Sequence, residues 1–216
     1  MKIKACCTPE NSGGFTLIEF MIVITILGIM ISIAAPSFAT WIRETRLIKS
    51  SEALNGALIQ ARNEALRIQS RVSLCRTGNV YGDDPNNPDD PECFDNITYN
   101  SEVNVTRDWS YGWLIYTAPT VSVAYDPLLP GHQLLAAVEG GEPDKLITIR
   151  SNAAARDFVT YGADGRLDSV SPLFSVCDDR NGGDSGAHGY RIEFSATGRA
   201  IMTDFQDFDE TPDCNP

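Results

Sequence analysis

The hydrophobic pattern of the chain begins with a continuous apolar segment, which runs from Phe15 to Phe38 after a short polar stretch. As an α-helix this segment would be roughly 36 Å long, enough to cross the hydrocarbon core of a bilayer. Its single charged residue is Glu19, and an ionisable side chain at that depth is costly and marks function by default. The pattern therefore predicts a membrane-spanning helix over residues 15–38 whose acid needs a partner from elsewhere. An α-amine exposed by cleavage just before Phe15 would supply one. Pro36 predicts a kink near the end of the segment.

After residue 38 the apolar positions take the spacing of an amphipathic helix. They recur every three, four or seven residues, which places them on one face of a helix: Leu47, Leu54, Leu58, Ala61, Ala65, Ile68 and Val72. We therefore expect a second helical half over residues 39–71 that buries this face. A coiled-coil seam is the alternative, but alanines in the seam favour packing on a core.

Beyond Val72 the pattern changes from helical to alternating. Short runs rich in β-branched and aromatic residues, separated by glycine and proline, predict strands. They lie at Val72–Cys75, Ile97–Val105, Tyr111–Thr117, Val121–Tyr125, Gln133–Val138, Lys145–Arg150, Phe158–Tyr161, Tyr190–Ser195 and Ala200–Phe205. Hairpin turns are expected at 163–166 and 196–199. The order predicts an α+β fold, in which one long helix packs on an antiparallel sheet within a β-rich globular domain over residues 72–216.

Composition narrows the function and the compartment. The 216 residues carry a net charge of −12, and an acidic body repels phosphate backbones. Of the six cysteines, four lie beyond the helix, with no C-x-x-C spacing, and this predicts two disulfides in an oxidising compartment. Three pairings are possible; we favour Cys75–Cys93 and Cys177–Cys214, because each closes a short polar segment. Zinc is the alternative, although the spacings fit no usual zinc ribbon or finger. Basic residues flank both ends of the apolar segment, so orientation rests on the disulfides, which indicate a cytoplasmic N-terminus and an external body.

The start of the apolar segment resembles the class III signal of type IV pilins and type II secretion pseudopilins. Gly14, Phe15 and Glu19 follow the order of that signal, and Pro36 matches a helix-bending proline common in the family. The resemblance implies that a prepilin peptidase removes residues 1–14 as a leader by cutting after Gly14, and N-methylates Phe15. It also implies that Glu19 neutralises the N-terminus of a neighbouring subunit during assembly. An ordinary signal peptide is cut after its apolar core. A single-pass anchor with a chance GFTLIE is the alternative.

The globular domain resembles the GspH/FimT (FimU-like) family of minor pilins and pseudopilins. A cysteine strand, a second cysteine and the segment Trp109–Tyr116 occur in that family's order, and the Gly165-Arg166 and Gly198-Arg199 turns recur there. The resemblance implies a pilin-like fold, an inner-membrane subunit with a periplasmic domain, and partners among other pilins or pseudopilins. We expect a minor pilin that primes or joins type IV pilus assembly; a type II secretion pseudopilin is the alternative.

DNA uptake is a further alternative. Some FimT-like proteins capture DNA through a C-terminal G-R-x-R turn, but here Gly198-Arg199-Ala200-Ile201 lacks the second arginine. Acidic residues follow the turn where phosphates would approach: Asp204, Asp207, Asp209, Glu210 and Asp213. We therefore do not expect DNA to be a partner.

No enzyme, cofactor or metal is expected from the remaining motifs. Gly183-Asp184-Ser185-Gly186 is the tetrapeptide around the nucleophile of trypsin-like proteases, but the only earlier histidine, His132, lies in an apparent turn. His188 fits a solvated loop. Two acidic loops could supply oxygen ligands to Ca²⁺ without matching an EF-hand, so solvated charge is the expectation; their acids are Asp83, Asp84, Asp89, Asp90 and Glu92, and Asp178, Asp179 and Asp184.

Overall fold

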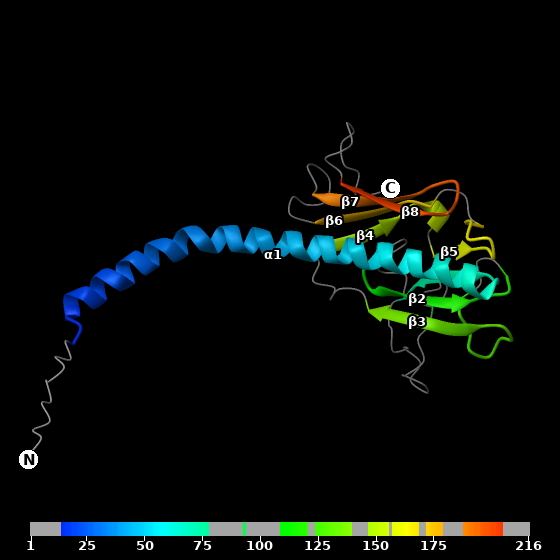
Figure 1. Cartoon of the computed structure of the whole chain (residues 1–216), viewed down its shortest axis with the longest axis horizontal. Helices are drawn as coiled ribbons and strands as arrows, with labels where there is room; N and C mark the ends of the chain where they lie inside the picture. The colour runs from blue at the N-terminus through cyan, green and yellow to red at the C-terminus, as the bar shows by residue number, and fades with distance from the viewer. Residues whose placement is uncertain are drawn as a thin grey trace, which may run out of the picture. The chain divides into compact units, whose positions relative to one another are not determined.

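The structure is a computed structural model that describes residues 14–77, 93, 109–120, 124–139, 147–155, 157–168, 172–178 and 188–204 (Figure 1). It divides into two compact units, Met1–Ile42 and Arg43–Pro216. One helix, α1, contributes its first half to the first unit and its second half to the second. We therefore describe the two halves of this helix separately.

Helix α1 spans Leu17–Ile68 as a single α-helix of 52 residues. The α-helix continues through Pro36, and the kink expected there stays a prediction. The helix ends slightly earlier than the expected residue 71. Gln69 adopts a positive φ of 52°, the left-handed conformation that commonly ends a helix. Val72, the last residue of the expected helical stripe, belongs instead to the first strand.

Within the described residues of the second unit, eight strands form two antiparallel sheets. The first sheet has the order β3-β2-β1-β5, with β1 at Val72–Arg76, β2 at Gly112–Thr117, β3 at Gln133–Glu139 and β5 at Phe158–Tyr161. The second has the order β4-β6-β7-β8, with β4 at Ile147–Ser151, β6 at Phe174–Asp178, β7 at Gly189–Phe194 and β8 at Ala200–Asp204. A short 3₁₀ helix, η1, lies at Ala153–Ala155.

Most of the expected strands that fall on described residues are present, and one strand was missed. Strand β6 was not predicted, although Phe174, Ser175 and Val176 alternate between apolar and polar; all five of its residues are buried, the polar Ser175 and Asp178 included. The expected strand at Val121–Tyr125 is wrong for Ala124 and Tyr125, which lie outside any strand. The expected strand at Ile97–Val105 lies outside the described residues.

One hydrophobic core joins the second half of α1 to both sheets. The helical stripe contributes five residues that are at most 1% exposed, which confirms the expected buried face: Leu47, Leu54, Leu58, Ala61 and Ala65. From the first sheet comes Trp113, and Trp109 packs edge-on against Phe174 of β6, with ring centroids 5.1 Å apart. Burying a leucine or aromatic side chain of this size stabilises the fold by about 1.5–3 kcal/mol. The α+β fold is confirmed, with two sheets where one was expected.

Two tyrosines of the first sheet are buried with their hydroxyl groups. Burial raises the pKa of Tyr161 well above its usual value, and the charge of Arg62 offsets this in part. Burial also raises the pKa of Tyr116, offset by a hydrogen bond with Ser73. Among the described residues the Tyr161 hydroxyl has no hydrogen-bond partner. Both side chains are therefore stable in this core only as neutral phenols.

Candidate functional site: the first half of the helix

Thr16 and Glu19 cap the start of α1 through reciprocal hydrogen bonds. The Glu19 carboxylate accepts hydrogen bonds from the Thr16 backbone N–H and the Thr16 hydroxyl, each at 2.9 Å, and the Glu19 N–H donates to that hydroxyl at 3.3 Å. This is a capping box, in which a threonine at the N-cap and a glutamate three residues later satisfy free donors of the first turn. The Thr-x-x-Glu spacing carries the signal for this cap, which goes unnoticed when Glu19 is considered only as an acid inside a membrane.

The side chains of the first half of α1 have no core of their own. Phe15 is 92% exposed, Leu17 74% and Ile33 69%, and the large apolar residues between them are exposed as well. Among the residues that the structure describes, α1 alone is long and apolar enough to cross a membrane, and none of its most apolar stretch is buried within the chain. This surface must be covered by something other than the chain itself.

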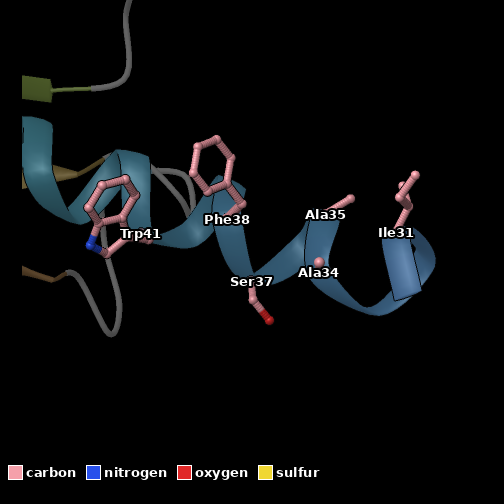
Figure 2. A pocket seen from close by; sticks show the side chains of 6 residues that line it. All are labelled: Ile31, Ala34, Ala35, Ser37, Phe38 and Trp41. Carbon is pink, nitrogen blue, oxygen red and sulfur yellow. The ribbon is translucent and has the colours of Figure 1, made fainter. Parts of the chain in front are cut away.

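An open apolar recess lies along this half of the helix, near its end (Figure 2). It is bounded by Phe38 and Trp41, whose ring centroids are 5.6 Å apart. Its other lining residues are mostly small: Ile31, Ala34, Ala35 and Ser37. Small residues beside large ones let a second helix approach closely, which is how helices pack inside membranes.

The expected site residues take two places along α1. Gly14, Phe15 and Glu19 come together at its start, and Pro36 lies within it, more than four turns further on. The rest of the expected leader, residues 1–13, lies outside the described residues. The arrangement places the Gly14–Phe15 peptide bond close in sequence to the Glu19 carboxylate, which is held by Thr16.

One of the two expected disulfides can be followed in full. Cys75 of β1 is bonded to Cys93, which lies 18 positions later in sequence, with their Cα atoms 5.7 Å apart. Cys177 of β6 is also disulfide-bonded. Its expected partner, Cys214, lies outside the described residues.

The two glycine–arginine turns pack against each other and against α1. Gly165 and Gly198 both have positive φ angles, of 74° and 78°. A Cβ on Gly198 would overlap the Gly165 carbonyl oxygen, and a Cβ on Gly165 would lie 2.9 Å from Leu66. From α1, Arg62 donates Nε to the Gly165 carbonyl at 3.0 Å and Nη2 to the Thr197 carbonyl at 3.2 Å. Packing therefore accounts for both glycines without a nucleic acid.

Of the remaining candidates, those on described residues do not gather into a second site. His132 is half-buried and accepts the Asp126 N–H at Nδ1, at 3.1 Å. The protease-like tetrapeptide around Ser185, the acidic loop at 83–92 and most of the acidic tail lie outside the described residues, and His188 follows the second acidic loop just before β7. Within the described ranges no three His, Cys, Asp or Glu residues cluster as a metal site requires.

Comparisons with known proteins agree with this geometry. The model of a prokaryotic N-terminal methylation motif matches residues 11–35. No curated protein matches the chain. The type IV minor pilin FimU of Pseudomonas aeruginosa, strain PAO1, is similar in two crystal forms, with a TM-score of 0.50 in each. The identities are 19% and 18%; the matches cover 79% and 78% of this chain, and 96% and 99% of the FimU chains.

At that identity the likeness to FimU shows a shared fold, the pilin fold of one long N-terminal helix packed on antiparallel strands. The family itself is shown by a second model, that of the type II transport protein GspH, which matches residues 50–198 and so covers the second half of α1 and both sheets. The chain belongs to the GspH family, and it carries the N-terminal methylation motif on the exposed half of its helix.

Proposed function

We propose that this chain is a minor pilin, a structural subunit that primes or joins a type IV pilus. A prepilin peptidase would cleave it after Gly14 and methylate Phe15, and residues 15–38 would hold it in the inner membrane until it enters the fibre. The observation that carries the proposal is the unburied apolar surface of the first half of α1. Neighbouring helices of the same kind would cover that surface, and no chemical step is proposed for the chain itself.

Glu19 would decide the register of assembly. In the uncleaved chain its carboxylate is held by Thr16, one residue from the peptide bond that cleavage would break. Cleavage would place a new α-amine on Phe15, and an unpaired charge in hydrocarbon costs several kcal/mol. A subunit would therefore add where its amine meets a neighbour's Glu19, because that position leaves neither charge alone.

The disulfides support a periplasmic position for the second unit. A bond such as Cys75–Cys93 persists in oxidising compartments. The N-terminus, and with it the leader, would then be on the cytoplasmic side of the membrane.

The test separates the charge of Glu19 from its capping role. Glutamine also serves in a capping box, so Glu19→Gln keeps the cap and removes the charge, whereas Glu19→Ala removes both. We expect both variants to reach the membrane at the normal level and to be lost from sheared fibres. Glu64→Gln, in the second half of α1, is the control and should enter fibres normally. Normal incorporation of Glu19→Gln would show that the charge has no role in assembly.

A type II secretion pseudopilin is the second candidate, and the GspH family model favours it. Both candidates use the same helix in the same way. Deletion of the gene separates them: loss of twitching or adhesion indicates a pilus, and retention of secreted enzymes inside the cell indicates a secretion pseudopilus. DNA uptake is not proposed, because packing accounts for the glycine of the relevant turn.

A further inference from the structure

Two aromatic residues, Phe38 and Trp41, lie at the end of the first unit, where the apolar segment ends. Their ring centroids are 5.6 Å apart, and the residues are 58% and 61% exposed (Figure 2). The other two tryptophans of the chain, Trp109 and Trp113, are at most 1% exposed and belong to the core of the second unit. The Phe38–Trp41 pair is therefore aromatic surface that the described part of the chain leaves largely uncovered.

Trp41 stands at the point where the sequence changes from apolar to charged. The preceding segment, residues 20–40, contains no charged residue. The eight residues that follow Trp41 hold three basic side chains, all exposed, and one acidic side chain: Arg43, Arg46, Lys49 and Glu44. A tryptophan ring is apolar except for its indole N–H, so it is favoured where hydrocarbon meets polar groups, and basic side chains near helix ends reach toward the same layer. This order of residues fits the boundary of a phospholipid bilayer.

The length of helix between the capping box and Trp41 also fits a bilayer. Trp41 lies 25 positions after Thr16 in the same unit, which corresponds to roughly 38 Å along a helix. The hydrocarbon core of a bilayer is about 30 Å thick, and the bilayer with its headgroup layers is about 40–45 Å thick. Even with a tilt of about 20°, Thr16 and Trp41 therefore cannot both lie in hydrocarbon. Both fit within the bilayer when each lies in one headgroup layer.

The hydroxyl groups in the middle of this stretch do not require water. The Thr25 hydroxyl donates to the Met21 carbonyl, and the Ser32 hydroxyl donates to the Ile29 carbonyl at 2.7 Å. Hydroxyl groups that bond to carbonyls of their own helix are tolerated in hydrocarbon. Acyl chains can therefore surround the middle of the stretch, whereas the capping box at one end and the indole at the other favour headgroup layers.

We propose that the Phe38–Trp41 pair anchors the unassembled subunit in one headgroup layer of a phospholipid bilayer and thereby fixes the depth of the whole membrane segment. The inference rests on the proposed function for the membrane placement of residues 15–38. It adds that Thr16 and Glu19 lie in the opposite headgroup layer, so hydrocarbon does not surround the Glu19 carboxylate before assembly. The cost of an unpaired charge in apolar surroundings then arises when the subunit enters a fibre. In a fibre, neighbouring helices replace the lipid, so the anchor belongs to the unassembled state.

The experiment measures tryptophan fluorescence of the full chain in phosphatidylcholine–phosphatidylglycerol vesicles, with enough lipid to keep the subunits apart. The lipids carry bromine, a contact quencher, either near the glycerol as a shallow label or near the end of the acyl chain as a deep label. Because Trp109 and Trp113 are buried in the core, quenching by lipid reports on Trp41. We expect the shallow label to quench more than the deep label, and Trp41→Phe to abolish the quenching. Stronger quenching by the deep label, or quenching by neither label, would overturn the proposal.

Two further variants, each made in the Trp41→Phe chain, calibrate the depth. Ile29→Trp and Leu17→Trp replace side chains that are 60% and 74% exposed, so neither change disturbs the core. Ile29→Trp lies near the middle of the stretch and should be quenched more by the deep label, whereas Leu17→Trp, at the first residue of α1, should be quenched more by the shallow label. Deep quenching of Leu17→Trp would overturn this inference alone. Absence of any lipid quenching of Ile29→Trp would overturn the membrane placement in the proposed function and this inference with it.

Discussion

The two halves of α1 form one continuous helix, but the apolar side chains of the second half are buried in the subunit's core and those of the first half are exposed. In the first half Leu27 is 53% exposed and its apolar neighbours are similar, whereas in the second half Leu54 and Leu58 are fully buried against the sheets. The second half has a polar face and a buried face, and the first is apolar all round. A helix that is apolar on every side needs partners on every side, which one sheet domain cannot supply.

The comparison teaches that one helix can serve two separate tasks. The second half belongs to the core and contributes to the stability of the subunit. The first half contributes little to that stability, because it has no core of its own, and is available for the membrane and for neighbouring subunits. The predictions below test this division through variants that differ mainly in their position along α1 or in their distance from its core.

The largest effect is expected for paired leucine substitutions in the two halves. Leu58→Ala removes a fully buried side chain and should lower the free energy of unfolding by about 3 kcal/mol. Leu27→Ala should change it by less than about 0.5 kcal/mol, since Leu27 is 53% exposed and belongs to no core cluster of the described residues. Denaturant unfolding of the full chain in detergent, followed by tryptophan fluorescence, measures both. Equal losses for the two variants would show that the halves do not differ in this way.

The disulfide of the first sheet should have an effect of similar size. Replacing Cys75 and Cys93 together by serine removes a crosslink between residues 18 positions apart and should lower the free energy of unfolding by about 3 kcal/mol. The bond lies in the second unit, so detergent-solubilised chain should still bind membranes through the first half of α1. Thermal melts and vesicle flotation measure the two properties. A loss of membrane binding together with stability would contradict their independence.

A smaller effect is expected for two arginines that are five residues apart on the second half of α1. Arg62→Ala removes the hydrogen bonds to both turns and should cost about 1–2 kcal/mol of unfolding free energy. Arg67 makes an ion pair with Glu64 at 2.7 Å, but its side chain is 67% exposed. Arg67→Ala should therefore cost less than about 0.5 kcal/mol. Denaturant unfolding measures both variants. A larger loss of unfolding free energy for Arg67→Ala than for Arg62→Ala would show that the hydrogen bonds from Arg62 to the turns contribute little to stability.

The smallest effect at neutral pH concerns the buried tyrosines. The raised pKa values of Tyr116 and Tyr161 mean that the unfolded chain loses phenolic protons before the folded chain does. Their contribution is complete below the unfolded pKa of about 10 and is lost as the pH rises toward the folded values, by about 1.4 kcal/mol per pH unit for each tyrosine. Tyr161→Phe removes a hydroxyl without a partner among the described residues, so it should be nearly neutral at pH 7 and should reduce the alkaline slope by about 1.4 kcal/mol per pH unit. An unchanged slope would show that Tyr161 is not protected by the core.

Much of the fold could be predicted, because local patterns carry it. The stripe from Leu47 to Ala65 follows helical spacing, and strand β5 was predicted at its observed bounds, 158–161. Strand β6 is short, and nothing in its local sequence shows that its polar positions, Ser175 and Asp178, are buried as fully as its apolar ones. The division into two sheets depends on pairings such as Val176 with Tyr190, which no local pattern specifies.

The residues of the candidate site can be named from the sequence, and their roles in cleavage and assembly stay predictions. Gly14, Phe15 and Glu19 lie together as their order along the chain requires. The Thr-x-x-Glu spacing also predicts the capping box between Thr16 and Glu19. One carboxylate can both cap a helix and lie within a membrane, and the cap goes unnoticed when only the membrane role is considered. Arg62 contacts Gly165, which is 103 positions later in the chain, and Thr197, which is 135 positions later. Contacts between residues so far apart in sequence are not specified by any local pattern.

The most direct test of the account is the mass of the N-terminal peptide of the chain recovered from sheared surface fibres. If cleavage after Gly14 removes the leader and leaves the first half of α1 as an assembly helix, that peptide begins at Phe15 and carries one added methyl group. A peptide that begins at Met1, or at any residue within α1, would contradict the account.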